Sequence, residues 1–91
     1  MHYVYMIKDS LENLYVGITE NLDNRLYDHN AKQGAQFTKF KTEFKLVFSE
    51  KYKTLADARR REIQIKKWRR NKKELLIARY SSGLPTKLSG A

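Results

Sequence analysis

Two short stretches near the start of the chain, residues 3–7 and 15–19, alternate in the character of their side chains. Tyrosine and β-branched residues are frequent in both, which is typical of strands. A polar, turn-prone segment at residues 9–13 separates them, and short polar links of this kind join antiparallel strands. The pattern therefore predicts a β-hairpin over residues 3–19.

The two faces of this hairpin should differ, because successive side chains of a strand point to opposite sides. An aliphatic face that packs inward would be formed by Val4, Met6, Val16 and Ile18. In the register that we expect, Tyr5 lies opposite Gly17 on the other face, and Tyr15 lies opposite Ile7. A slip of one residue would exchange the faces. The missing side chain at the glycine would let a ligand backbone approach the tyrosines.

A helix is predicted over residues 22–33, capped by Asn21 or Thr19. Gly34 is the expected C-terminal stop of this helix. Residues 35–45 show no clear period and are interpreted as a loop.

The inward stripe of this first helix contains Leu22 and Leu26 at a spacing of four residues. Arg25 and His29 fall close to the same stripe at about 100° per residue. They should therefore be neighbours and should point toward whatever the helix packs against. If that partner is the sheet, both side chains approach the tyrosine face.

The rest of the chain predicts one strand and two helices. Residues 46–52 form the strand, and Thr54 caps a helix over residues 55–70. Asn71 marks a break, and a short helix follows over residues 72–80. Residues 1–80 would then form one domain, followed by a frayed tail over residues 81–91.

Glu62 lies on the second of these helices and is bordered by apolar positions. Carboxylates are rarely placed there unless they are paired or bind a metal. Arg59 and Lys66 are three and four residues away and would be its ion-pair partners under the simpler interpretation. Trp68 is expected to cover an apolar contact, with stacking on a nucleobase as the alternative.

Composition limits the class of protein. A chain of 91 residues forms one domain, with a monomer as the default. It contains no cysteine, so disulfides and thiolate metal sites are excluded. It has no apolar run near the roughly 20 residues of a membrane span and no start resembling a signal peptide. We therefore expect a cytoplasmic protein without a membrane partner.

The net charge of +9 is unevenly distributed. Residues 1–53 contain 8 Lys or Arg and 7 Asp or Glu, whereas residues 54–91 contain 11 and 3. A basic surface of this kind attracts polyanions, nucleic acid first among them. The alternative is a solvated basic helix that keeps the protein soluble.

The candidate chemistry is hydrolysis of a phosphodiester, which needs an activated water and stabilisation of phosphoryl charge. Glu62 alone suggests a single, largely hydrated ion such as Mg²⁺. Arg25 can donate bidentately to phosphate, and Tyr5, Tyr15 or His29 could handle protons. Each residue also has an ordinary structural role: the tyrosines as amphipathic sheet residues, His29 as a surface residue and Arg25 as an ion-pair partner.

Several segments together resemble the GIY-YIG nuclease superfamily over residues 3–80. These segments are Tyr3-Val4-Tyr5, Tyr15-Val16-Gly17, Asn24-Arg25-Leu26 with His29, the loop Gly34-Ala35-Gln36-Phe37-Thr38, and Arg61-Glu62 with residues 63–68. The last two resemble the small stand-alone members in particular. Tyr3 stands where the motif that names the superfamily has glycine.

The resemblance implies a small α/β (α+β) fold, a three-stranded antiparallel sheet flanked by helices. It also implies an endonuclease that uses Mg²⁺ (or Mn²⁺), with Glu62 as the metal ligand. The resemblance further implies that Arg25 stabilises the charge of the phosphate and that Tyr5 is the general base or orients the attacking water. The supporting residues that the resemblance implies are Tyr15, His29 and Gly17. Glu62 and Arg25 should then converge over the tyrosine-lined part of the sheet.

Two functions follow from these residues, beside a third drawn only from the charge, an RNA- or ribosome-associated protein. The first is an endonuclease that cuts DNA, selective for structures that arise in repair or recombination. The second is a non-catalytic nucleic-acid-binding module of the same fold, favoured by the lack of the late asparagine of many active members, since none follows Asn71. In both, the expected contacts to the DNA backbone are Lys66, Lys67, Arg69, Arg70, Lys72 and Lys73.

Overall fold

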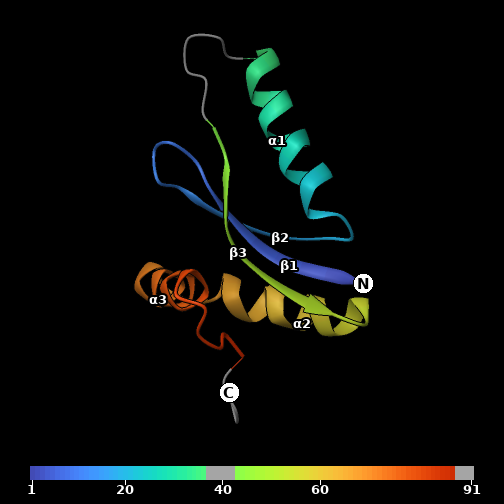
Figure 1. Ribbon diagram of the computed structural model, residues 1–91, viewed down its shortest axis with the longest axis vertical. Helices are drawn as coiled ribbons and strands as arrows, with labels where there is room; N and C mark the ends of the chain where they lie inside the picture. Colours follow the sequence, from blue (N-terminus) through green and yellow to red (C-terminus); the bar gives the residue numbers. More distant parts are fainter. Residues whose placement is uncertain (37–42, 88–91) are drawn as a thin grey trace.

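The structure, a computed structural model, describes residues 1–36 and 43–87. Its elements are β1 (His2–Lys8), β2 (Leu14–Thr19), α1 (Leu22–Gln36), β3 (Lys45–Tyr52), α2 (Leu55–Lys66) and α3 (Arg70–Ser81). The strands form one antiparallel sheet in the order β2-β1-β3. Figure 1 shows α1 on one side of this sheet, and α2 and α3 on the other. The predicted fold, a three-stranded antiparallel sheet flanked by helices, is confirmed.

The register of the hairpin is the predicted one. Tyr5 pairs with Gly17 and Ile7 pairs with Tyr15 in the β1–β2 ladder. Strand β1 is central, and because helices cover both sides of the sheet its side chains are buried on both faces rather than on one. This explains why it contains so few polar residues between its ends.

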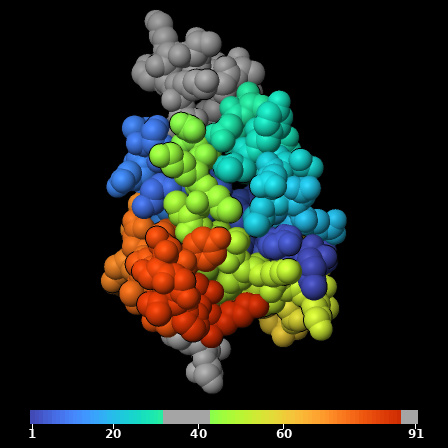
Figure 2. Space-filling model, viewed as in Figure 1, coloured from blue at the N-terminus to red at the C-terminus, as the bar shows by residue number. Residues whose placement is uncertain are grey.

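Two apolar clusters hold the sheet between its helices. The cluster on the α2 and α3 side contains Val4, Met6, Phe48, Ala58, Ile65 and Leu76. The smaller cluster on the α1 side contains Tyr5, Ile7 and Phe44, and half-buried Leu22 and Leu26 pack against it. The predicted stripe of α1 thus faces the sheet. The space-filling view shows α1 separate from the α3 region of the surface, with the strands between them (Figure 2).

The boundaries after the hairpin differ from the prediction. Helix α1 continues to Gln36, so Gly34 does not end it. A glycine inside a helix costs only about 1 kcal/mol relative to alanine, which neighbouring helical residues and packing can override. Strand β3 already begins at Lys45. The rest of the predicted loop, residues 37–42, lies outside the described residues.

The break between the last two helices comes earlier than Asn71. Helix α2 ends at Lys66 and α3 begins at Arg70, so Asn71 is helical. Arg69 takes the extended conformation between them, with φ −72° and ψ 162°. Trp68 packs against the larger apolar cluster at this point. Burial of the tryptophan side chain therefore determines where the turn lies. Local helix propensity does not predict this burial.

The chain beyond α3 returns to the body of the protein. Arg61 donates to the carbonyl of Thr86 at 3.0 Å, and Arg79 donates to that of Pro85 at 2.8 Å. Lys87 Nζ donates to the carbonyl of Lys51 at 3.0 Å. These contacts hold residues 85–87 against the rest of the protein. Residues 88–91 lie outside the described part, and the domain limit at residue 80 stays a prediction. None of the described helices is long and apolar enough to cross a membrane.

Candidate active site

The hydroxyl of Tyr5 is the centre of a small polar cluster between β1 and α1. Tyr5 is buried and only 4% exposed. Arg25 Nε donates a hydrogen bond to its oxygen at 3.2 Å, and His29 Nε2 lies 3.4 Å from the same oxygen. Arg25 and His29 are one helical turn apart, so α1 presents both to the sheet. The predicted approach of these two residues to the tyrosine face is confirmed.

Gly17 makes room for this cluster from the neighbouring strand. A Cβ atom at position 17 would lie 2.5 Å from the Tyr5 hydroxyl oxygen and 2.7 Å from the adjacent ring carbon. Carbon and oxygen atoms that are not bonded do not approach so closely. The clearance expected at Gly17 exists, but the Tyr5 side chain fills it, which corrects the idea that it lets a ligand backbone approach the sheet directly.

Arg25 is held as a cation and remains accessible. The hydrogen bond to Tyr5, together with the charge interaction between the two groups, raises the pKa of the Arg25 guanidinium. The residue is exposed, and only its Nε donates among the contacts of the described residues. The Nη groups can therefore donate to an anion that approaches from solvent, in the fork geometry that suits phosphate.

Tyr15 lies on the same side of the sheet but has a different partner. Its hydroxyl donates to Asp9 at 3.2 Å. Its ring meets Phe44 edge to face with centroids 5.5 Å apart, and Phe44 lies 5.3 Å from the His29 ring. Burial and the Asp9 carboxylate raise the pKa of Tyr15. Tyr15 is thus connected to the Tyr5 cluster through packed rings, and its phenol is a proton donor at neutral pH.

Asp9 is a residue that the sequence analysis missed. Its carboxylate accepts from the backbone N–H of Leu11 at 2.9 Å and of Asn13 at 2.8 Å, besides the Tyr15 hydroxyl. Burial raises the pKa of Asp9, but these hydrogen bonds outweigh it and lower the pKa overall. An aspartate at the start of a hairpin link is a signal for such a turn, because its side chain can accept from the backbone two residues on.

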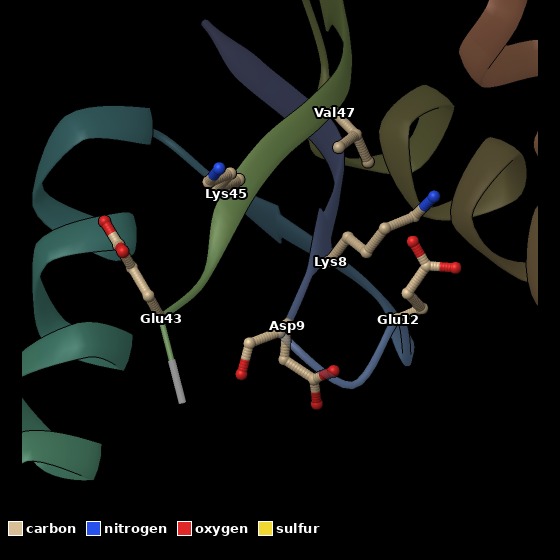
Figure 3. A pocket seen from close by; sticks show the side chains of 7 residues that line it. Lys8, Asp9, Glu12, Glu43, Lys45 and Val47 are labelled. Carbon is tan, nitrogen blue, oxygen red and sulfur yellow. The ribbon is translucent and has the colours of Figure 1, made fainter. Parts of the chain in front are cut away.

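The hollow beside this turn contains charges of both signs. Lys8, Asp9 and Glu12 come from the hairpin, and Glu43 and Lys45 come from the segment that enters β3 (Figure 3). Among residues 1–36 and 43–87, no three His, Asp or Glu side chains are grouped so that they could hold a metal ion. The hollow therefore does not provide a multi-carboxylate metal centre.

A second contact missed by the sequence analysis joins α1 to the start of β3. Asn30 Oδ1 accepts from the backbone N–H of Phe44 at 2.7 Å, and Asn30 Nδ2 donates to its carbonyl at 3.3 Å. This pair positions the Phe44 ring beside His29. No periodic signal in the sequence indicates it, because the two residues are far apart along the chain.

Glu62 occupies the buried face of α2. Its side chain is 12% exposed, and Lys66 Nζ lies 3.2 Å from Oε2. Of the two ion-pair partners that the spacing allowed, Lys66 is therefore the one used. Ala58 and Ile65 of the same helix pack on the face of the sheet opposite to Tyr5. Among the described contacts Glu62 meets Lys66 and not Tyr5 or Arg25, so its convergence with them stays a prediction.

The surroundings of Glu62 are compatible with one hard cation. The ammonium group of Lys66 lies against the carboxylate and would have to move aside for a metal ion. A single carboxylate suits Mg²⁺, which keeps several of its water ligands. The donor set therefore fits one hydrated divalent ion.

The six basic residues expected to contact DNA have different surroundings. Lys66 pairs with Glu62, and Arg70 forms two hydrogen bonds with Glu74 at 3.1 and 3.0 Å. Lys67 and Arg69 are exposed, and neither has an acidic partner within the part of the chain that the structure describes. The other two are exposed Lys72, which lies over Trp68, and half-buried Lys73.

Comparison with known proteins agrees with this fold. The family model described as the GIY-YIG catalytic domain matches residues 1–75. A UPF0213 protein of Natronomonas pharaonis is 40% identical over 77 residues, which are 85% of this chain and 91% of that protein. A UPF0213 protein of Staphylococcus aureus is 41% identical over 76 residues, which are 84% and 93%.

A solved structure is also similar. It is the solution NMR structure of a UPF0213 protein from Bacillus halodurans, with 32% sequence identity and a TM-score of 0.56. The match covers 85% of this chain and 82% of that protein. Sequence and structure therefore agree on the same relatives, and the chain belongs to the GIY-YIG catalytic domain family.

Proposed function

We propose that this protein is a divalent-metal-dependent endonuclease that hydrolyses phosphodiester bonds in DNA. One observation carries the proposal: the Tyr5 hydroxyl lies between Arg25 and His29, in clearance that Gly17 provides. This arrangement places a cation and two proton-handling groups around one point. Family membership supports a nuclease; the metal, the DNA and the repair role are our extension.

Arg25 would bind the phosphate group that is cut. Its Nε is held by Tyr5, which orients the guanidinium and leaves the Nη groups for two parallel hydrogen bonds. Charge that develops on the phosphoryl oxygens would thus meet a donor that needs no reorganisation.

Tyr5 would orient the attacking water or accept its proton. The Nε–H of Arg25 points at the phenolic oxygen, and His29 Nε2 lies within reach of the phenolic proton. In the neutral tautomer with an unprotonated Nε2, His29 would accept a proton that leaves Tyr5. Tyr15 would support the site indirectly, through the Phe44 ring that contacts both Tyr15 and His29. Its hydroxyl donates to Asp9, which keeps it in position.

Glu62 is the residue that would hold the metal ion. A bound Mg²⁺ or Mn²⁺ would neutralise phosphate charge and lower the pKa of a bound water. Strand β2 is an edge strand. A DNA backbone at this edge could meet Arg25 from one side of the sheet and α2 from the other.

Recognition of DNA would not depend on reading the edges of the bases. Exposed Lys67 and Arg69 extend the basic surface beyond the Tyr5 cluster. Contacts of this kind read the phosphate backbone and carry little sequence information. We therefore propose weak sequence preference and recognition of flexible or branched DNA, as in repair or recombination.

A cleavage assay tests this proposal. Supercoiled plasmid and branched DNA are incubated with Mg²⁺ or Mn²⁺ and with purified wild type, Glu62→Gln or Arg25→Ala. Removal of the arginine should cost on the order of a thousandfold in rate. Arg60→Ala is the matched control, because Arg60 is 79% exposed on α2 and pairs only weakly with Asp57 at 3.7 Å. Equal cutting by all four proteins would reveal a contaminating nuclease and would end the proposal.

The second candidate is a DNA-binding module without catalysis. The ion pair between Glu62 and Lys66 favours it, since the carboxylate already has a partner. In that case no variant cuts DNA and all four proteins bind it equally. Binding by gel shift, measured on the same preparations, distinguishes the two functions.

A further inference from the structure

The corner between α2 and α3 carries two adjoining hollows, which we call the Trp68 surface. One is lined by Arg61, Gln64, Trp68, Lys72, Leu75, Leu76, Arg79 and Thr86, and the other by Lys67, Trp68, Arg69, Asn71, Lys72 and Leu75. Trp68, Lys72 and Leu75 belong to both. The surface lies on the side of the sheet away from Tyr5, so the proposed active site does not include it.

The charge of the Trp68 surface has a single sign. The lining residues include five cations and no carboxylate. Arg69 and Arg70 stand at the start of α3, whose first turn contains no acidic residue. Cations at a helix start oppose the helix dipole. Arg70 is accounted for by its ion pair with Glu74, but helix stability does not explain why Arg69 is basic, whereas a polyanionic partner does.

The floor between these cations is apolar. Leu75 is 61% exposed, which leaves a branched aliphatic side chain in water. The Trp68 ring is half-buried, with its inner part packed against the larger apolar cluster. A partner that only offers phosphates would leave this floor uncovered. The partner should therefore combine negative charge with flat or apolar groups at close spacing.

Two cations lie against the Trp68 ring, and they differ in how firmly other residues hold their side chains. Arg61 Cζ is 5.2 Å from the ring centroid and is fixed by Glu50 at 2.9 Å. Lys72 Nζ is 4.4 Å from the centroid, and its side chain has no carboxylate partner within the described residues. Lys72 can therefore leave the ring for a phosphate oxygen, and a base can take its place.

We propose that the Trp68 surface binds an unpaired strand of DNA. A base would lie against Trp68 and Leu75, and neighbouring phosphates would contact the cations Lys67, Arg69 and Lys72. Duplex DNA hides the faces of its bases, so only an unpaired segment offers both groups at once. Proteins that bind single strands combine a basic groove with aromatic side chains in this way.

This inference rests on the proposed function only in taking DNA as the partner. It adds the substrate class: DNA with an unpaired segment, such as a flap or a branch. The strand would be held on the α2 and α3 side while the duplex portion lies near Arg25. An acidic, apolar peptide is the competing partner and is an outcome of the test below.

The tryptophan itself reports the contact, because Trp68 is the only one in the chain. Its fluorescence is followed while oligothymidylate, an abasic deoxyribose phosphate chain of equal length or a blunt duplex is added without divalent metal. We expect quenching by oligothymidylate at about a tenfold lower concentration than by the other two, since stacking of a base on an aromatic side chain adds to the affinity. Equal affinity for the abasic chain, or no quenching, would overturn the proposal.

Leu75→Glu tests the apolar floor without touching the core. It should weaken binding of labelled oligothymidylate about tenfold, as measured by anisotropy. Leu55→Glu is the matched control: Leu55 is 46% exposed, is also on the α2 and α3 side, lines neither hollow and undergoes the same change of charge. Equal weakening by both variants would show a general charge effect and would contradict the proposal, as would binding of an acidic peptide in preference to the oligonucleotide.

The single-strand binding proposal and the nuclease proposal can each be contradicted independently of the other. The titrations are repeated with Arg25→Ala, whose substitution lies in the proposed active site and should leave quenching unchanged. If no protein cuts DNA but Leu75-dependent quenching persists, this inference stands and the nuclease proposal falls. If wild type cuts branched DNA but oligothymidylate does not quench Trp68, the inference falls alone.

Discussion

The hydroxyl of Tyr5 occupies the space that a side chain at Gly17 would need. A Cβ atom there would lie 2.5 Å from the hydroxyl oxygen. The Tyr5 ring is buried and its oxygen contacts Arg25 and His29. The glycine on one strand therefore determines where the tyrosine on the next strand can hold its polar partners.

Gly17→Ala should move the Tyr5 hydroxyl away from Arg25 and impair DNA cleavage. Because the ring is buried, the shift should also destabilise the fold, by about 1–3 kcal/mol. Tyr5→Phe in the same chain removes the closest atom, so the double variant should recover part of the stability but none of the activity. Urea unfolding and plasmid cleavage measure the two effects. If Gly17→Ala retained full activity, the position of the hydroxyl would be unimportant.

Asp9→Asn should lower the pKa of Tyr15. The carboxylate and burial together raise it above the ordinary value of 10.0, and an amide removes the charge that favours the neutral phenol. Tyrosine ¹³Cζ chemical shifts followed against pH give the pKa, with Tyr15→Phe assigning the signal. Glu12→Gln, a change of equal charge in the same turn, is the control. An unchanged Tyr15 titration in Asp9→Asn would exclude the carboxylate as the cause.

The pair of Glu50 and Arg61 should make the fold sensitive to acid. Burial raises the pKa of Glu50, but hydrogen bonds, led by that of Arg61 at 2.9 Å, lower it overall, below the ordinary value of 4.5. A folded-state pKa below the unfolded one gives stability that is complete above the unfolded pKa. That stability is lost as the pH falls through the folded pKa.

Glu50→Gln should therefore be less stable than wild type by about 3 kcal/mol near neutral pH, because Arg61 loses its buried partner. The difference should shrink as the pH falls below the unfolded pKa. Urea unfolding across this range measures it. Glu20→Gln is the control, since that side chain is 78% exposed. A constant difference at all pH values would argue against a titrating Glu50.

Lys66→Met should strengthen binding of Mn²⁺ at Glu62. The ammonium group at 3.2 Å competes with a metal ion for the same carboxylate. A half-exposed ion pair contributes up to about 1 kcal/mol, so the affinity should rise by about twofold to fivefold. Calorimetric titration or the electron paramagnetic resonance signal of free Mn²⁺ reports it. Lys67→Met removes the same charge from an exposed neighbour, and equal gains in both variants would count against direct competition.

Local sequence determined two parts of the candidate site. The alternation along residues 3–19 determined the register that pairs Tyr5 with Gly17. The spacing of four residues determined that Arg25 and His29 share one side of α1. Both depend on backbone geometry within one element or across one tight link, which the residues themselves encode.

Only the tertiary structure decided what these side chains meet. The bond from Tyr15 to Asp9, the Phe44 ring beside His29, the turn placed at Trp68 and the pair of Glu50 with Arg61 all depend on packing. The side of the sheet that each helix covers was decided in the same way, with α1 over Tyr5 and α2 over Val4 and Met6. Such contacts join segments that are brought together by burial of apolar surface. The local pattern of residues does not indicate which side of the sheet a helix will cover.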